Sequence, residues 1–250
     1  MPSYLVTGAS RGLGFGFIQT LYRNPNNTVI GLVRDKKATD KKLAEEGAVE
    51  AVSDIAGGSL DFIIANAGLI PLWSQWDAVD VLAKIPEHLV KDLQDSFNVN
   101  VIGNFHLFNL FTPLVLKGQG KKVIAISSGM SDIDFIRQFE IDPAPAYAIS
   151  KVGTSVLTAK FAALYAKEGV LFMSICPGSV DSGFEGELTE EQKEKVARLG
   201  SKFVNYATDF KGPSTPVDSA TAVLNVMNEA SLEKGSSGAF VSKFGNKQWM

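Results

Sequence analysis

Tyr147 and Lys151 are the two residues whose types and spacing point most directly to acid–base chemistry. The segment Tyr147-Ala148-Ile149-Ser150-Lys151 opens a helical pattern after Pro145, so side chains four positions apart share one face. A phenol with a pKa of about 10 is a poor catalyst near neutral pH, but a nearby ammonium lowers that pKa. The same spacing also fits an amphipathic helix with a core tyrosine and a solvated lysine, so the neighbouring motifs must decide.

Three apolar runs end in polar or turn-forming residues. The runs are Val123–Ile126 before Ser127-Ser128, Phe62–Ala65 before Asn66-Ala67-Gly68, and Leu171–Ile175 before Cys176-Pro177-Gly178. Ligands of open parallel sheets bind at the carboxyl ends of the strands. We therefore expect these residues to meet at one edge, together with Tyr147.

A glycine-rich turn follows the first apolar run, with the sequence Thr7-Gly8-Ala9-Ser10-Arg11-Gly12-Leu13-Gly14. Glycines let the backbone approach a pyrophosphate, and the helix that follows offers free N–H groups and a positive dipole end. A plain tight turn is the alternative. The strand before the turn and the helix after it favour a dinucleotide site.

The end of the second predicted strand indicates which dinucleotide binds. An NAD site usually has an acidic residue there for the ribose 2′-hydroxyl, but this chain has Arg34 after Val33. Arg34 and Arg11 would suit the 2′-phosphate of NADP(H) through charge-assisted hydrogen bonds. The alternative is that both arginines are surface residues and that Asp35 contacts the ribose. We expect NADP(H) over NAD(H).

Short β-branched runs alternate with helical patterns along the chain, which predicts an α/β fold with a doubly wound parallel sheet. We expect a single domain over residues 1–250. The predicted strands, about seven, are Tyr4–Thr7, Thr28–Val33, Ala48–Val52, Asp61–Ala65, Lys122–Ser127, Leu171–Cys176 and Ala239–Ser242. The predicted helices are Leu13–Arg23, Lys36–Glu46, Pro86–Leu116, Ala146–Lys167, Thr189–Ala207 and Pro216–Ala230.

Composition narrows the function classes. The 250 residues carry a net charge of −3 with no long single-sign run, so we expect neither a nucleic acid nor a membrane as partner. A single cysteine excludes an internal disulfide and fits a reducing compartment, so we expect a cytoplasmic protein. His88 and His106 have no partners at metal-ligand spacing, so we predict no metal site.

Together these motifs resemble the short-chain dehydrogenase/reductase family over nearly the whole chain. The matching segments are TGASRGLG, ANAG, NVIG, the ISS strand end, YAISK and PGSV. A narrower resemblance, carried by AYAISK and the closing SGAFVSKFGNKQW, is to fungal ketoreductases of the norsolorinic acid reductase type.

The resemblance implies a role for each matching residue. Tyr147 is the acid–base, Lys151 holds the nicotinamide ribose and tunes Tyr147, Ser128 orients the carbonyl, and Asn100 holds a proton-relay water. The implied cofactor-binding residues are Gly8, Ser10, Arg11, Gly12, Leu13, Gly14, Arg34, Asp54, Asn66, Ala67, Gly68, Tyr147, Lys151, Pro177, Gly178, Val180 and Ser182.

Two segments depart from the family pattern. The interval between Ser128 and Tyr147 is longer than usual, and we predict that Asp132–Pro145 forms part of a substrate wall, with a surface loop as the alternative. Only Ile55–Leu60 separates Asp54 from Asp61, too short for the usual crossover between parallel strands. We therefore predict that the helix between the third and fourth strands is shortened or absent.

The residues that would contact the substrate are the ones that the sequence predicts least clearly. We expect residues 183–215 to form a lid over the substrate, or else a fixed pair of helices. Trp73 and Trp76 after ANAG suit a bulky, aromatic or polyketide-like ketone. The stripe Phe97, Phe105, Phe108 and Phe111 fits either core packing or a helix surface in a homodimer or homotetramer.

The sequence thus predicts an NADP(H)-dependent oxidoreductase that interconverts a small-molecule carbonyl and its alcohol. Other reactions on the same scaffold, such as epimerisation or dehydration, stay open. The alternative from another class is a nucleotide-binding or interaction protein with weak or no turnover. This alternative is disfavoured by the presence of all four expected catalytic residues, Asn100, Ser128, Tyr147 and Lys151. It is favoured by the short Asp54–Asp61 connection.

Overall fold

A parallel sheet with the strand order β2-β1-β3-β4-β5-β6 forms the centre of the computed structural model, which describes residues 1–33, 41–183 and 188–250, with 41–46 as backbone only. Every neighbouring pair of these strands is parallel. The strands are β1 Ser3–Thr7, β2 Thr28–Leu32, β3 Phe62–Ala65, β4 Lys122–Ile126, β5 Leu171–Cys176 and β6 Phe240–Ser242. The doubly wound α/β fold expected from the sequence is therefore confirmed.

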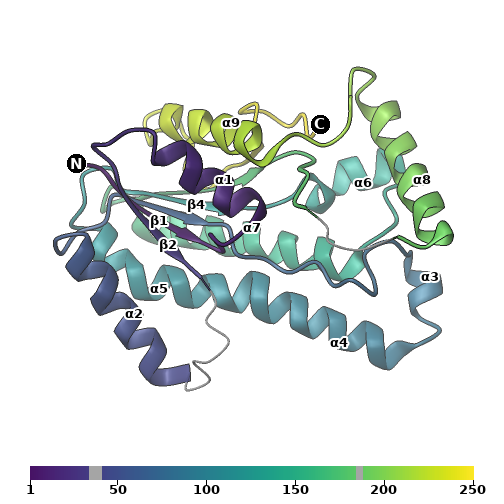
Figure 1. The fold of residues 1–250 in the computed structure, drawn as a ribbon, viewed down its shortest axis with the longest axis horizontal. Helices are drawn as coiled ribbons and strands as arrows, with labels where there is room; N and C mark the ends of the chain where they lie inside the picture. The colour runs from purple at the N-terminus through teal and green to yellow at the C-terminus, as the bar shows by residue number, and fades with distance from the viewer. Residues whose placement is uncertain (34–40, 184–187) are drawn as a thin grey trace.

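Helices cover both faces of the sheet, with α1 and α9 above it and α2 and α5 below it in the view of Figure 1. The α-helices are α1 Gly12–Leu21, α2 Lys41–Ile55, α3 Val79–Leu82, α4 Pro86–Phe97, α5 Gly103–Val115, α6 Ile133–Phe139, α7 Pro145–Tyr165, α8 Glu190–Tyr206 and α9 Pro216–Glu229. A π-helix, η1 Asn98–Ile102, joins α4 to α5, and a short 3₁₀ helix, η2 Gly129–Ser131, follows β4.

Successive strand residues point to opposite faces and so build two separate cores. Leu5, Ile63 and Val123 lie in the core with α5 and α7, whereas their neighbours Val6 and Ile64 lie in the core with α1 and α9. Both faces of each central strand are therefore buried, which explains the continuous apolar runs in the sequence.

The predicted third strand, Ala48–Val52, is wrong, because these residues belong to α2. Alanine and glutamate favour a helix, and helical spacing places Val49 and Val52 together against the core. The described residues contain six strands rather than about seven, and α2 leads straight into β3. No separate helix lies between Asp54 and Asp61, as predicted, and the strand predicted before that connection is missing as well.

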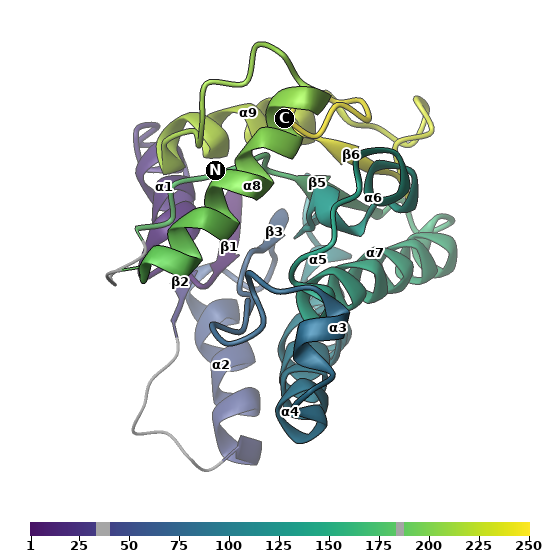
Figure 2. The same ribbon diagram turned by 90° about the vertical axis from the view of Figure 1, so that its right-hand side faces the viewer.

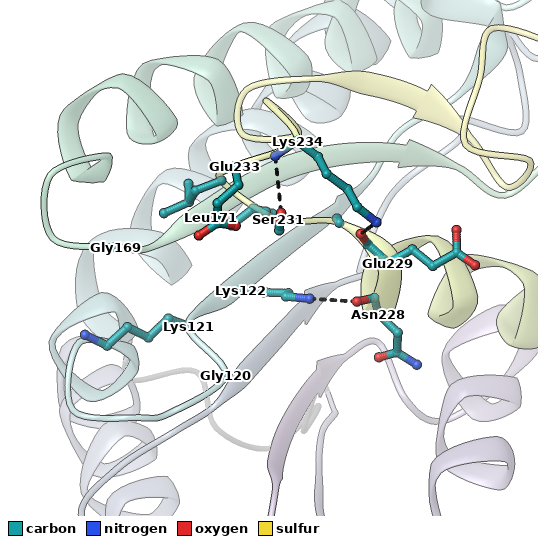
Figure 3. Close-up of a pocket in the computed structure, with 12 residues that line it drawn as sticks. Gly120, Lys121, Lys122, Gly169, Leu171, Asn228, Glu229, Ser231, Glu233 and Lys234 are labelled. Carbon is teal, nitrogen blue, oxygen red and sulfur yellow. Dashed lines mark hydrogen bonds between the residues drawn. The ribbon is translucent and has the colours of Figure 1, made fainter.

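An open hollow of about 350 Å³ lies at the amino ends of β4 and β5 (Figure 3), whereas Lys151 contacts the last residue of β4, at the other end of that strand. Its lysines serve the carboxyl end of α9: Lys122 Nζ donates to the carbonyls of Met227 and Asn228, and Lys234 Nζ donates to that of Glu229. Burial, and then the Lys234 ammonium, lower the pKa of Lys122. These cations stabilise a helix terminus, and we assign the hollow no catalytic role.

The helices of the described residues include none with the length and apolar composition that crossing a membrane requires.

Candidate active site

Tyr147 and Lys151 lie in the first two turns of α7, where the helix meets the carboxyl end of β4. Pro145 occupies the first position of the helix, and Lys151 Nζ lies 5.7 Å from the centre of the Tyr147 ring. Lys151 is only 3% exposed, and its Nζ donates to the carbonyl of Ile126, the last residue of β4, at 2.7 Å. The ammonium is thus fixed under the phenol rather than extended into solvent.

Burial shifts the pKa values of both groups toward their neutral forms. It raises the pKa of Tyr147 to about 12, against the opposing effect of a hydrogen bond from Ser128. It lowers the pKa of Lys151 to about 8. The phenol therefore keeps its proton through the physiological range, and its pKa is raised by burial rather than lowered by the ammonium as expected from the sequence. The lysine charge is lost just above neutral pH.

Ser128 is the member of the serine pair that reaches Tyr147. It has extended backbone (φ −150°) at the start of η2, and its Oγ accepts a hydrogen bond from the Met130 N–H. Ser127 instead is buried, with its Oγ 3.0 Å from that of Ser155. At the end of β4, the Ser128 hydroxyl therefore lies at the phenol, and the Ser127 hydroxyl contacts α7.

Asn100 occupies the middle of η1, fully buried. Its side chain holds both backbone polar groups of Leu69: Oδ1 accepts from the Leu69 N–H at 2.8 Å, and Nδ2 donates to the Leu69 carbonyl at 2.9 Å. A Cβ added at Gly68 would lie 3.2 Å from Asn100 Oδ1 and 3.4 Å from Lys151 Nζ. Asn100, Gly68 and Lys151 therefore lie close together, and the proton-relay water that the resemblance implies for Asn100 stays a prediction.

The glycine turn lies beside the loop after β3. Gly8 and Gly12 have positive φ values of 67° and 53°, which glycine adopts most readily. A Cβ at Gly14 would lie 2.1 Å from the Gly8 carbonyl oxygen and 2.6 Å from Asn66 Nδ2, so the helix packs directly on the turn. Asn66 Nδ2 also donates to the Thr7 carbonyl at 3.0 Å.

The amino end of α1 is open to an anion. Arg11 is its exposed N-cap residue and makes no capping hydrogen bond, and the first turn has no acidic residue. Ser10 is exposed and Leu13 half-buried in the same turn. The free N–H groups and helix dipole at this position are suited to a pyrophosphate, so the residues present fit a dinucleotide.

The loop after β5 closes the ring of strand ends. Gly178 has a φ of 77°, Val180 pairs with Ser214 in an isolated parallel bridge, and Pro177 accepts at its carbonyl from Ser219 Oγ at 2.8 Å. Ser182 lies beside the glycine turn, because a Cβ at Gly12 would be 3.5 Å from its Cβ. The loops after β1, β3, β4 and β5 thus surround one region at the carboxyl edge of the sheet.

Of the remaining predicted cofactor residues, one falls outside the described part of the chain and one is not brought to this region. Arg34 lies outside the described residues. Asp54 lies at the carboxyl end of α2, which leads toward the amino end of β3 at the opposite edge of the sheet (Figure 1). Its expected contact with the adenine depended on a third strand that the chain does not form.

Comparison with known proteins agrees with this geometry. The sequence profile described as short chain dehydrogenase matches residues 3–193, most of the chain. The chain belongs to the short-chain dehydrogenase/reductase family.

Similar family members come from fungi. The chain is 48% identical to the short chain dehydrogenase virK of Hypocrea virens and 39% identical to the short-chain dehydrogenase/reductase iacC of Pestalotiopsis fici, in each case over the full length of both chains. The virK alignment runs over 271 positions, whereas this chain has 250 residues. That relative therefore carries residues that this chain lacks.

Solved structures share the fold at lower identity. An NADPH-bound carbonyl reductase from chicken fatty liver superimposes with a TM-score of 0.73 at 24% identity, covering 98% of each chain. Carbonyl reductase Sniffer of D. melanogaster gives 0.73 at 18% identity, also with 98% of each chain covered.

Two residues of this short-chain dehydrogenase/reductase site were not predicted from the sequence. Thr7 Oγ1 accepts from the N–H groups of Asn66 and Ala67, and so joins the glycine turn to the loop after β3. Cys176, expected only as a buried strand residue, accepts at Sγ from the N–H of Gly129 at 3.0 Å. The position of Thr7 in the TGAS motif could have indicated its role. The residues around Cys176 in the sequence give no indication that its thiol connects two loops.

The region expected to form a lid contains α8, which crosses in front of the carboxyl edge of the sheet in Figure 2. Lys195 pairs with Asp77 of the loop after β3, with 2.6 Å between Nζ and Oδ1. Lys202 pairs with Asp142, ahead of α7, at 2.6 Å. Ion pairs therefore tie α8 to both sides of the site.

The long interval before Tyr147 folds as η2 and α6 rather than as a bare loop. Phe135 and Phe139 of α6 contact Tyr206 of α8 with ring centres 4.6 and 4.8 Å apart, and Trp249 joins the same apolar cluster. This segment is thus a packed wall between the sheet and α8.

Proposed function

We propose that the protein is an NADP(H)-dependent carbonyl reductase and alcohol dehydrogenase that acts on bulky, aromatic or polyketide-like ketones. The observation that carries this proposal is the convergence of Tyr147, Ser128 and Lys151 at the end of β4. The carbonyl reductase structures of the same fold support it.

The residues have separate tasks in the proposed reaction. Ser128 and Tyr147 donate hydrogen bonds to the substrate carbonyl oxygen and so stabilise the negative charge that develops there. Tyr147 then passes its proton to that oxygen, and the Lys151 ammonium stabilises the phenolate that remains. Bound NADPH, held by the glycine turn, the Pro177–Ser182 loop and Lys151, would supply the hydride.

The first experiment is a fluorescence titration with NADPH and NADH, followed by NADPH-consumption assays with a panel of bulky ketones. We expect tighter binding of NADPH and turnover of at least one bulky ketone. Failure of both nucleotides to bind would overturn the proposal.

Arg11→Ala tests the preference for NADP(H). Loss of a charge-assisted hydrogen bond to the 2′-phosphate should weaken NADPH binding by about tenfold to a hundredfold, with NADH changing by less than about twofold. Arg23→Ala, at an exposed position just beyond the other end of α1, is the matched control and should leave both affinities unchanged. Equal losses for NADPH and NADH in Arg11→Ala would reject the assignment of Arg11.

The pH dependence should follow Lys151. Below a pKa of about 8 its ammonium stabilises the forming phenolate; above it the neutral amine does not. Tyr147, with a pKa of about 12, keeps its proton throughout this range. We therefore expect kcat/KM for ketone reduction to fall as pH rises through about 8, with circular dichroism confirming that the fold persists. A profile that stays flat to pH 10 would contradict this role.

Exposed apolar side chains near the site support a bulky apolar substrate, and an ion pair between α8 and a nearby loop supports a lid. Ile70, Leu72 and Trp73 are exposed in the loop that follows the Asn66-Ala67-Gly68 turn. We propose that this loop and residues 183–215, with α8, enclose an apolar substrate, the Asp77–Lys195 pair linking the two.

We also propose that two or four copies of the chain associate through α4, η1 and α5. The predicted phenylalanine stripe divides: Phe108 and Phe111 are buried in the core, whereas Phe97 and Phe105 are each 46% exposed. Val99 and Ile102 are exposed beside them. A second copy would remove this apolar surface from water.

We also propose a cytoplasmic location, as expected from the sequence, with which the buried free thiol of Cys176 is compatible.

A further inference from the structure

Nearly all the polar groups of Asn100 form hydrogen bonds with other groups of the protein. Both Nδ2 protons are used, by the Leu69 carbonyl and by Ser150 Oγ at 2.8 Å. Its backbone carbonyl accepts from Asn104 Nδ2 at 2.7 Å and from Thr154 Oγ1 at 2.8 Å. A carbonyl oxygen has two lone pairs, so these two side chains already occupy the carbonyl of Asn100. We therefore read this residue as a structural junction between η1, α7 and the loop after β3.

Ser150 is the partner that connects this junction to the catalytic turn. It lies between Tyr147 and Lys151 in sequence and is only 1% exposed. Its Oγ accepts from Asn100 Nδ2 and donates to the backbone carbonyl of Tyr147 at 2.7 Å. An unbroken line of hydrogen bonds thus runs from Leu69 through Asn100 and Ser150 to the backbone of Tyr147.

The amino end of α7 needs such support. The N-cap residue is Ala144, in the left-handed region with a φ of 56°, and it makes no side-chain capping hydrogen bond. Helix ends without a cap leave their first N–H groups unsatisfied and fray readily. Tyr147 is the third residue of this helix, so fraying here would displace the phenol itself.

We propose that Ser150 is a positioning residue that holds the first turn of α7 against η1, through its hydrogen bonds to Asn100 Nδ2 and to the Tyr147 carbonyl. The proposal rests on the proposed function, because it assigns Ser150 the task of keeping Tyr147 and Lys151 aligned for proton transfer. Ser150 touches neither substrate nor cofactor in this account. It acts through the backbone of Tyr147.

The test compares Ser150→Ala with Ser150→Thr, which keeps the hydroxyl, and with Thr158→Val. Thr158 is an equally buried hydroxyl on α7 that bonds only its own helix, at the Thr154 carbonyl. Misalignment of reacting groups by about an ångström costs roughly a hundredfold in rate. For Ser150→Ala we expect kcat to fall by about tenfold to a hundredfold, with the NADPH Kd and the ketone KM within about threefold of wild type. Ser150→Thr should recover most of kcat, and Thr158→Val should keep it.

Hydrogen exchange supplies a readout that does not depend on turnover. In Ser150→Ala the amides of residues 146–151 should exchange faster, with no change in the strands. A kcat for Ser150→Ala no lower than that for Thr158→Val, no rescue by threonine in a folded variant, or unchanged exchange in the first turn of α7 would each overturn the proposal. If Tyr147→Phe keeps full turnover, the proposed function fails instead, and the two failures are thereby distinguished.

Discussion

Replacing Tyr147 by phenylalanine should reduce turnover by about a thousandfold or more while leaving NADPH binding within about twofold of wild type. General acid–base catalysis contributes roughly a hundredfold to ten-thousandfold, and the same hydroxyl also donates to the carbonyl oxygen. The change removes one oxygen atom and keeps the ring that packs over Lys151. Steady-state assays with excess NADPH and a fluorescence titration measure the two quantities.

Tyr165→Phe is the matched control for this experiment. Tyr165 lies at the other end of α7 and stacks on Phe172 of the core, with ring centres 5.9 Å apart. Its loss of a hydroxyl should leave kcat and nucleotide binding unchanged. Turnover of Tyr147→Phe equal to that of Tyr165→Phe would remove Tyr147 from the mechanism.

A single methyl group at Gly14 should weaken nucleotide binding strongly. The new Cβ would lie 2.1 Å from the Gly8 carbonyl oxygen, a backbone atom that cannot turn away, so α1 must shift from the end of β1. Misplacing the helix terminus removes at least two charge-assisted hydrogen bonds to the pyrophosphate, roughly 3 kcal/mol or more, hence a loss of affinity of about a hundredfold. We expect overpacking to lower the free energy of unfolding by roughly 1–3 kcal/mol as well.

Gly47→Ala separates this steric effect from a general effect of replacing a helical glycine. Gly47 lies in α2, and a Cβ there would meet no atom within 4 Å. Alanine in an exposed helix interior should raise the free energy of unfolding by about 0.5–1 kcal/mol and leave NADPH binding unchanged. Urea unfolding curves and NADPH titrations of both variants make the comparison. Wild-type affinity in Gly14→Ala would show that the glycine turn does not hold the nucleotide.

Locally encoded features were predictable from the sequence. The glycine turn is fixed by a strand, three glycines and a helix in direct succession, and the shared face of Tyr147 and Lys151 follows from helical geometry alone. Strand ends such as Ser127-Ser128 could be placed at one edge because parallel strands align their carboxyl ends. The fold and the family were therefore accessible before the structure.

Features that depend on packing between distant segments could not be predicted from the sequence. Ala48–Val52 has the apolar content of a strand, and only its packing within α2 shows the helix. The π-helix η1 could not be predicted, because the sequence from Pro86 has the pattern of one long helix. Asn100 lies in η1, where its side chain bonds to Leu69 and Ser150. Ser150 itself looks like a neutral residue between two catalytic ones until the η1 segment is placed beside it.

The most direct test of the account is the transfer of deuterium from NADPH deuterated at the reactive nicotinamide carbon to a ketone substrate, followed by mass spectrometry of the alcohol. We predict one deuterium on the carbinol carbon and, for Tyr147→Phe, formation of labelled product that is slower by about a thousandfold or more. NADPH that binds at the glycine turn without labelling any product of the ketone panel would contradict the account and favour a nucleotide-binding protein without turnover.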